Sequence, residues 1–93
     1  MHEFMVHAAI PVLRMLDESA TKAFYCERIG FAIDWEHRFH PEWRDSPLYL
    51  QVRRGDAVLH LNGHAGTDAP TAEVRIPVHG LEAFASWLGA RSV

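Results

Sequence analysis

A pair of alternating segments around a Gly-Asp turn, at residues 48–62, constrains the fold of this chain most strongly. Residues 48–54 read LYLQVRR, residues 57–62 read AVLHLN, and Gly55 and Asp56 separate them. Apolar and polar side chains in alternation are typical of a β-strand with one buried face, and a short Gly-containing connection is typical of a hairpin. The sequence therefore predicts a hairpin whose leucines face a helix layer. Its open face is predicted to carry Tyr49, Gln51, Arg53, Val58, His60 and Asn62.

Three elements are predicted before this hairpin. Residues 4–13 are mostly apolar and predict a strand. Asp17 is placed to cap a helix that ends at Gly30, because a Gly just past the last turn readily adopts a positive φ. Residues 31–39 alternate and predict a second strand. One face of that strand is predicted to carry Phe31, Ile33, Trp35, His37 and Phe39, and the other Asp34, Glu36 and Arg38.

Two elements are predicted after the hairpin. Residues 72–78, AEVRIPV, predict a strand, and residues 81–91 predict a helix with an apolar stripe. The stripe consists of Leu81, Phe84, Ala85 and Leu88. The predicted order is β-α-β-β-β-β-α, an α+β fold in which a strand followed by a helix begins each half.

Length and composition limit the classes of function. The chain has 93 residues and a formal net charge of −3, which predicts one domain with a small core. Nucleic acid is not an expected partner because such binding needs clustered Lys and Arg. No segment approaches the ~20 apolar residues of a membrane span, so no membrane association is expected. A single cysteine, Cys26, suits a reducing compartment, and the protein is predicted to be cytoplasmic.

Several short motifs, taken in order, carry a family resemblance. They are the strand IPVLR leading to Asp17, the helix exit AFY…IGF, the strand DWEHRF, the hairpin RGDAVLHL and the helix start V-x-GLEAF. In this order and spacing, over nearly the whole chain, they resemble the glyoxalase and bleomycin-resistance family of the vicinal oxygen chelate superfamily. The likeness is greatest to the bleomycin-resistance branch.

The resemblance implies a fold of paired βαβββ modules in one domain, residues 1–93. Module one would span about residues 3–64, and a partial module two about residues 71–93, stopping after its helix. In the family the second module continues into three strands. Because unpaired strand edges invite pairing with another chain, the expected assembly is a homodimer formed by strand exchange or edge pairing.

The resemblance also bears on metal binding. Metal-dependent relatives have a His on the first strand, seven residues before the capping Asp, and an acidic ligand on the fourth strand. Here Ile10 occupies the first position and His60 falls at about the second. Because a catalytic metal usually needs about three protein ligands, no cofactor is expected and no catalytic residue is assigned. A divalent metal stays as an alternative, with His60 as a weak candidate ligand.

The expected ligand-binding residues are His60, Tyr49, Gln51, Trp35 and Trp43. For Trp35 two interpretations stay open, a core stripe or a stacking surface for a flat or cationic ligand. Trp43 lies in a predicted loop, where a core role is less common. Asp34 and Glu36 are either a solvated strand face or carboxylates that attract a cation.

Together these observations favour a protein that binds and sequesters a small molecule without chemistry. The resemblance suggests a cationic glycopeptide antibiotic as the ligand, held in a cleft between subunits. One alternative is a metal-dependent glyoxalase-like lyase or dioxygenase. Another is a truncated member of the family that binds no ligand.

Overall fold

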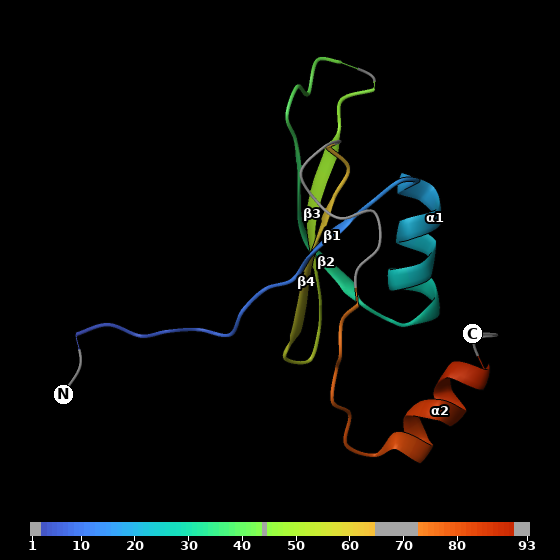
Figure 1. Ribbon diagram of the computed structural model, residues 1–93. Coiled ribbons are helices and arrows are strands. Elements are labelled where there is room, and N and C mark those ends of the chain that lie inside the picture. Colours follow the sequence, from blue (N-terminus) through green and yellow to red (C-terminus); the bar gives the residue numbers. More distant parts are fainter. Residues whose placement is uncertain (1–2, 44, 65–72, 91–93) are drawn as a thin grey trace.

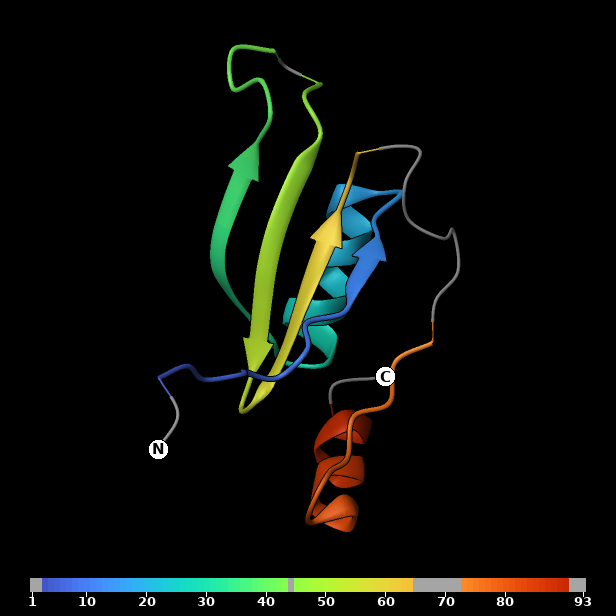
Figure 2. The same ribbon diagram turned by 60° about the vertical axis from the view of Figure 1, so that its left-hand side comes forward.

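The computed structural model describes residues 3–43, 45–64 and 73–90. Its centre is a mixed sheet of four strands in the order β1-β4-β3-β2, with one helical segment on one face (Figures 1 and 2). The strands are β1 (Val12–Arg14), β2 (Ala32–Arg38), β3 (Leu48–Arg54) and β4 (Ala57–Asn62). The helices are α1 (Glu18–Lys22), which continues as the π-helix η1 (Ala23–Arg28), and α2 (Leu81–Ala90). The predicted α+β class is confirmed.

The hairpin of β3 and β4 is confirmed, with both of its faces. Gly55 takes a φ of 57° in the turn, a value that Gly adopts without strain. Antiparallel pairing places Leu50 opposite Leu61 and Val52 opposite Leu59, and these four side chains are at most 3% exposed. Other buried apolar side chains complete the core: Met15, Phe31 and Leu48.

The predicted helix and both of its end signals are also confirmed. The Asp17 carboxylate accepts a hydrogen bond from the amide of Ala20 at 2.9 Å, which satisfies one free N–H of the first turn. At the other end Gly30 has a φ of 76°, as a residue following the last turn requires. Tyr25 and Cys26 pack from η1 against the core, so this helix covers the leucine face of the sheet.

The second strand departs from the predicted alternation. The pairing of β2 with β3 shifts register between Ile33 and Trp35, the mark of a β-bulge, in which one strand carries an extra residue. Ile33 lies opposite Val52 on the helix face, whereas Trp35 lies opposite Gln51 on the open face. The prediction that Ile33 and Trp35 share a face was therefore wrong.

The same bulge separates two acidic residues that were predicted to share a face. Asp34 bonds with Gln51 and Arg53 on the open face. Glu36 instead forms an ion pair with Lys22 of α1 at 2.6 Å on the helix face. Asp34 and Glu36 are thus neither one solvated face nor a carboxylate pair.

The first strand is much shorter than predicted. Only Val12–Arg14 pair with β4, in parallel, and the Pro11 carbonyl accepts from the His60 amide at 2.9 Å. Pro11 has no N–H to donate, which favours the end of pairing at this point. Residues 4–10 project as an extended arm on the side of the sheet away from α1 (Figure 1). Their apolar side chains are exposed, with Val6 at 87%.

The last predicted strand is absent from the described residues. Residues 73–78 form no strand, because a strand needs a neighbour for its backbone hydrogen bonds, and no sheet ladder among the described residues includes them. The predictions that fall on residues 65–70, Ala72 and Arg91 lie outside the described part of the chain.

The second helix is confirmed as α2, but its predicted stripe is only partly covered. Phe84 and Leu88 are half-buried, whereas Leu81 is 66% exposed. Arg54 of the hairpin holds this helix: its guanidinium carbon lies 4.2 Å from the centre of the Trp87 ring and 5.2 Å from that of Phe84. Among the described residues, no helix has the length and apolar character needed to cross a membrane.

Candidate functional site

An aromatic and polar cluster occupies the open face of the sheet. The helix α1 covers the other face (Figure 1). Three neighbouring strands supply it, and the strand register brings its members together. Trp35 of β2 lies opposite Gln51 of β3, and Gln51 lies opposite His60 of β4. Because directly opposed residues share a face, these side chains project from the same surface. The structure thus brings together four residues predicted for the site: Trp35, Tyr49, Gln51 and His60.

Three rings of this open-face cluster pack on one another. The Trp35 and Tyr49 rings are stacked, with their centres 5.9 Å apart and 7° between their planes. The His60 ring meets both edge to face, at 5.3 Å from Trp35 and 5.2 Å from Tyr49. Trp35 keeps 42% of its surface exposed. The cluster therefore presents an aromatic surface to solvent and holds it in a defined geometry.

Hydrogen bonds join the same residues into a continuous chain. The Tyr49 hydroxyl lies 2.7 Å from Nδ1 of His60, and Nε2 of His60 lies 2.8 Å from the amide oxygen of Gln51. The Gln51 amide nitrogen then donates to the Asp34 carboxylate at 2.8 Å. Nε of Arg53 donates to the same carboxylate oxygen at 3.0 Å. Both nitrogens of His60 are thus engaged by neighbouring side chains.

Asp34 is the member of this chain that sequence analysis placed on the wrong face. The hydrogen bond from Gln51, followed by that from Arg53 and its positive charge, lowers the pKa of the Asp34 carboxyl. The carboxylate is therefore ionised over a wider pH range than a free aspartate. Strict alternation put Asp34 and Trp35 on different faces of the strand, and β2 contains no Gly or Pro that would signal the bulge.

The model of the family described as "Glyoxalase superfamily protein" matches residues 1–92. The chain belongs to the glyoxalase superfamily. Among solved structures, the chain is similar to the one titled "Crystal structure of SMU.1112c", with 22% identity and a TM-score of 0.62, over 95% of this chain and 77% of that one. It is also similar to a glyoxalase family protein from Enterococcus faecalis, with 22% identity and a TM-score of 0.56, over 99% of this chain and 75% of that one. No curated protein matches.

At this level of identity the two solved structures support the fold of the glyoxalase superfamily domain. The architecture of the described residues agrees with a glyoxalase fold: a mixed four-stranded sheet with one open face and α1 on the other face (Figure 1). The open-face cluster therefore lies on a surface that the helices do not cover.

Trp43, the fifth predicted site residue of this glyoxalase superfamily chain, lies in the loop between β2 and β3. Its ring stacks on that of His40, with centres 4.0 Å apart, and it is 58% exposed. Figure 1 shows this loop beyond the ends of the two strands. The sheet register that brings the other four residues together does not position Trp43.

The aromatic surface extends toward that loop through residues that were not predicted for the site. The Phe39 ring lies 5.2 Å from the ring of His37 and 5.4 Å from that of His64. His37 lies opposite Tyr49 in the sheet, which places it on the open face. Sequence alternation did put His37 and Phe39 beside Trp35, and that part of the pattern could have extended the predicted site.

The side chains near His60 do not fit the metal centre that metal-dependent relatives carry. The ring of His60 already meets Tyr49 and Gln51 through both nitrogens. Ile10 lies on the arm and offers no donor atom. Among the described residues no group of three His, Cys, Asp or Glu side chains could hold a metal ion.

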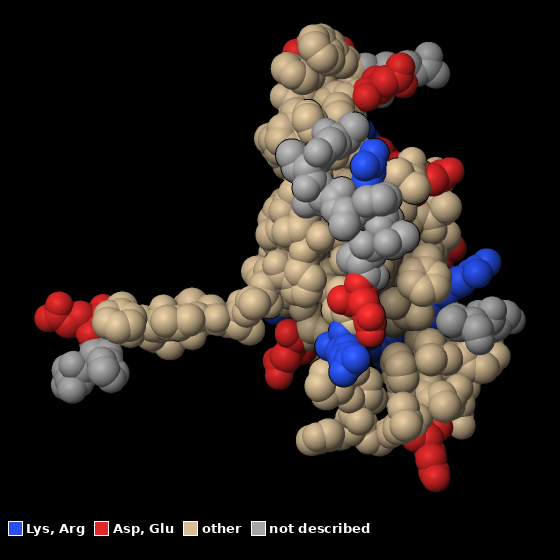
Figure 3. All heavy atoms as spheres, in the orientation of Figure 1, with Lys and Arg blue, Asp and Glu red and all other residues tan. Residues whose placement is uncertain are grey.

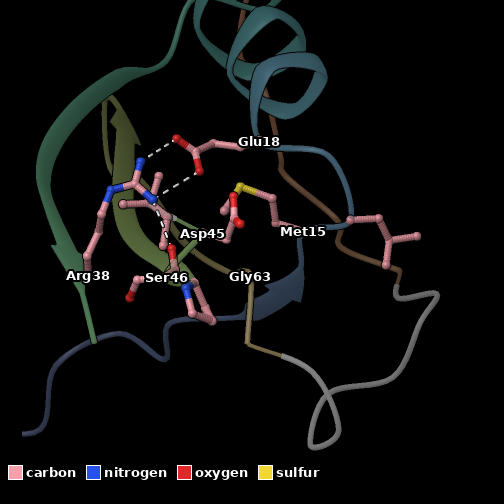
Figure 4. A pocket seen from close by; sticks show the side chains of 9 residues that line it. Met15, Glu18, Arg38, Asp45, Ser46 and Gly63 are labelled. Atoms are coloured by element: carbon pink, nitrogen blue, oxygen red, sulfur yellow. Dashed lines mark hydrogen bonds and ion pairs between the residues drawn. The ribbon is translucent and has the colours of Figure 1, made fainter. Parts of the chain in front are cut away.

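A polar cavity of about 250 Å³ lies away from the open-face cluster, at the start of α1 on the helix side of the sheet (Figure 4). The guanidinium of Arg38 points toward Glu18, which accepts two hydrogen bonds at 2.6 and 3.3 Å. The same guanidinium donates to the Ser46 carbonyl at 3.0 Å. Glu18 raises the pKa of Arg38. These contacts hold α1 against β2, so Glu18 and Arg38 have a structural role in the cavity.

Proposed function

We propose that this glyoxalase superfamily protein binds and sequesters a flat, positively charged small molecule, in the manner of the bleomycin-resistance branch and without chemistry. The observation that carries the proposal is the convergence of Trp35, Tyr49, Gln51 and His60 on the open face of the sheet. A half-exposed ring set and a few oriented polar groups are the usual composition of a small-molecule site. A cationic glycopeptide antibiotic is the ligand class that the branch suggests.

The attraction for a cation comes from the rings and from the charge of the whole chain. A cation over the face of an aromatic ring gains about 0.5–2 kcal/mol, and Trp35 is 42% exposed. Asp34 adds little, because Arg53 already offsets its charge at 3.0 Å. The formal net charge of −3 favours the approach of a cation from a distance.

We further propose that a second copy of the chain completes the cleft, by strand exchange or edge pairing. The Cα radius of gyration is 15.4 Å, whereas a compact domain of this length has about 12 Å. The N-terminal arm extends away from the sheet and increases this radius. Beyond Glu3 near its tip, the arm carries no Lys, Arg, Asp or Glu side chain (Figure 3). An apolar groove of about 1090 Å³ also lies between the hairpin and α2. Uncovered apolar surface of this kind favours association.

The half-buried free thiol of Cys26 accords with a cytoplasmic location, which is part of the proposal. Burial raises the pKa of this thiol, and a raised pKa leaves less of the reactive thiolate. No redox role is therefore assigned to Cys26.

Native mass spectrometry of the purified protein, with and without copper-free bleomycin, tests the proposal. We expect a dimer that takes up about one drug molecule per cleft. Trp35→Ala should weaken drug binding about tenfold, the equivalent of one lost aromatic contact of ~1.4 kcal/mol. Phe24→Ala removes a 43% exposed ring from the helix side and is the matched control, with binding unchanged.

Three outcomes would contradict the proposal in different ways. A dimer that holds a divalent ion tightly and ignores the drug would favour a metal-dependent lyase or dioxygenase. A dimer that binds neither would identify a member of the superfamily without this ligand. A folded monomer at micromolar concentration would refute the shared cleft.

A further inference from the structure

Asp34 is the extra residue of the β-bulge in β2, between Ile33 and Trp35. In an uninterrupted strand Ile33 and Trp35 would share a face, but here Ile33 lies on the helix face and Trp35 on the open face. The bulge at Asp34 therefore turns the rest of the strand over, so that Trp35 and His37 project from the open face. What it adds is a carboxylate on the open face, in contact with Gln51 and Arg53. Bulges often re-aim a side chain next to a functional site.

The carboxylate determines which way the Gln51 amide points. An ionised carboxylate can only accept hydrogen bonds, so the Gln51 atom 2.8 Å from it must be the amide nitrogen. The opposite orientation would place two acceptors against each other. Arg53 donates to the same oxygen at 3.0 Å and holds it in place. The Gln51 oxygen is therefore the atom that faces His60.

The orientation of Gln51 in turn determines the proton position on His60. Nε2 of His60 lies 2.8 Å from the Gln51 oxygen, an acceptor, so Nε2 must carry the proton. In the neutral ring Nδ1 is then an acceptor, and the Tyr49 hydroxyl at 2.7 Å donates to it. For the neutral ring, this is the one assignment that gives every bond of the chain one donor and one acceptor.

We propose that Asp34 is a positioning residue that acts through Gln51 to select the tautomer of the neutral His60 ring, with the proton on Nε2 and Nδ1 as an acceptor. This inference deepens the proposed function, on which its role in ligand selection rests, because the proton position decides the polarity of the open-face cluster. With Nδ1 as acceptor, the Tyr49 hydrogen is directed inward to His60. The cluster then directs its hydrogens inward, a polarity that suits a cationic ligand better than an anionic one.

The test is a long-range ¹H–¹⁵N correlation spectrum of the histidine rings at pH 8, above the ordinary range of histidine titration. His60→Phe assigns the signals by the loss of one set. In the wild type we expect the pattern of protonated Nε2 and unprotonated Nδ1 for His60. Asp34→Ala frees the Gln51 amide to turn, and the two nitrogen signals should move toward each other. Glu36→Gln, which removes a carboxylate from the opposite face of the same strand, should leave the pattern unchanged.

A charge inversion gives the sharper result. In the Asp34→Lys/Arg53→Glu double variant the introduced ammonium donates to the Gln51 oxygen, so the amide nitrogen turns toward His60. Nε2 must then accept and Nδ1 must carry the proton. We expect the His60 signals to change to those of a ring with a protonated Nδ1 and an unprotonated Nε2. An intrinsic preference of imidazole for one tautomer cannot produce this reversal. If the backbone spectrum shows that this variant does not fold, Gln51→Leu breaks the same link, with the loss expected for Asp34→Ala.

An unchanged His60 pattern in Asp34→Ala and Gln51→Leu would overturn the inference, as would a wild-type proton on Nδ1. No ligand is present in these measurements. A failure of drug uptake therefore refutes the proposed function and leaves this inference standing, whereas a failure of the spectra does the reverse.

Discussion

Leu50→Ala tests where the stability of this small domain resides. The Leu50 side chain is 0% exposed, at the middle of β3. Removing a fully buried leucine costs about 2.7–5 kcal/mol, the loss of transfer free energy plus the cavity left behind. A chain of this length has a total of roughly 5–14 kcal/mol. We therefore expect Leu50→Ala to remove about 3 kcal/mol, roughly a fifth or more of the whole free energy of unfolding.

Leu81→Ala is the matched control in α2, because it makes the same chemical change at a position that is 66% exposed. Its expected cost is about 0.5 kcal/mol or less. Urea unfolding followed by tryptophan fluorescence measures both, at one fixed protein concentration because association shifts the apparent stability. Equal costs for the two variants would refute the reasoning, since α2 would then contribute as much to the core as β3. A cost below ~1 kcal/mol for Leu50→Ala would refute it as well.

Three further predictions follow from single contacts. Arg54→Ala removes the guanidinium stacked on Trp87 at 4.2 Å, a contact of about 0.5–2 kcal/mol, and should speed amide hydrogen exchange in α2 while β3 and β4 stay protected. Asp17→Ala deletes the helix cap that binds the Ala20 amide and should cost ~1 kcal/mol in thermal unfolding, whereas Asp17→Asn should keep most of it. The lowered pKa of Asp34 contributes stability above the unfolded value near pH 4, which is lost as pH falls through the folded value. Asp34→Asn should therefore flatten the acid limb of the stability curve.

The parts of the fold that sequence reasoning predicted correctly are those with short-range signals. Gly55 at the turn and the alternation of β3 and β4 lie within a few residues of one another. Asp17 marks the start of the helix because its carboxylate caps a free amide, and Gly30 marks the end because it adopts a positive φ. Such signals need no knowledge of distant neighbours, and each was confirmed.

The two wrong strands show the opposite case. Residues 4–10 and 73–78 have the composition of strands, but a strand exists only where another backbone is aligned to receive its hydrogen bonds. In the described residues β4 pairs with β1 only from Val12, and residues 73–78 join no ladder. Composition reports a preference for extended backbone; the partner decides whether a strand forms.

The prediction of which side chains share the open face is correct where alternation holds and wrong where it breaks. On the hairpin the period of two placed Tyr49, Gln51 and His60 on one face, and the structure agrees. On β2 the same period puts Ile33 and Trp35 on one face. They can lie on opposite faces only if the residue between them is an extra one. The bulge supplies that residue. It places Trp35 on the open face and Asp34 beside Gln51 on the same face, so the irregularity that interrupts the alternation also brings both residues to the candidate site.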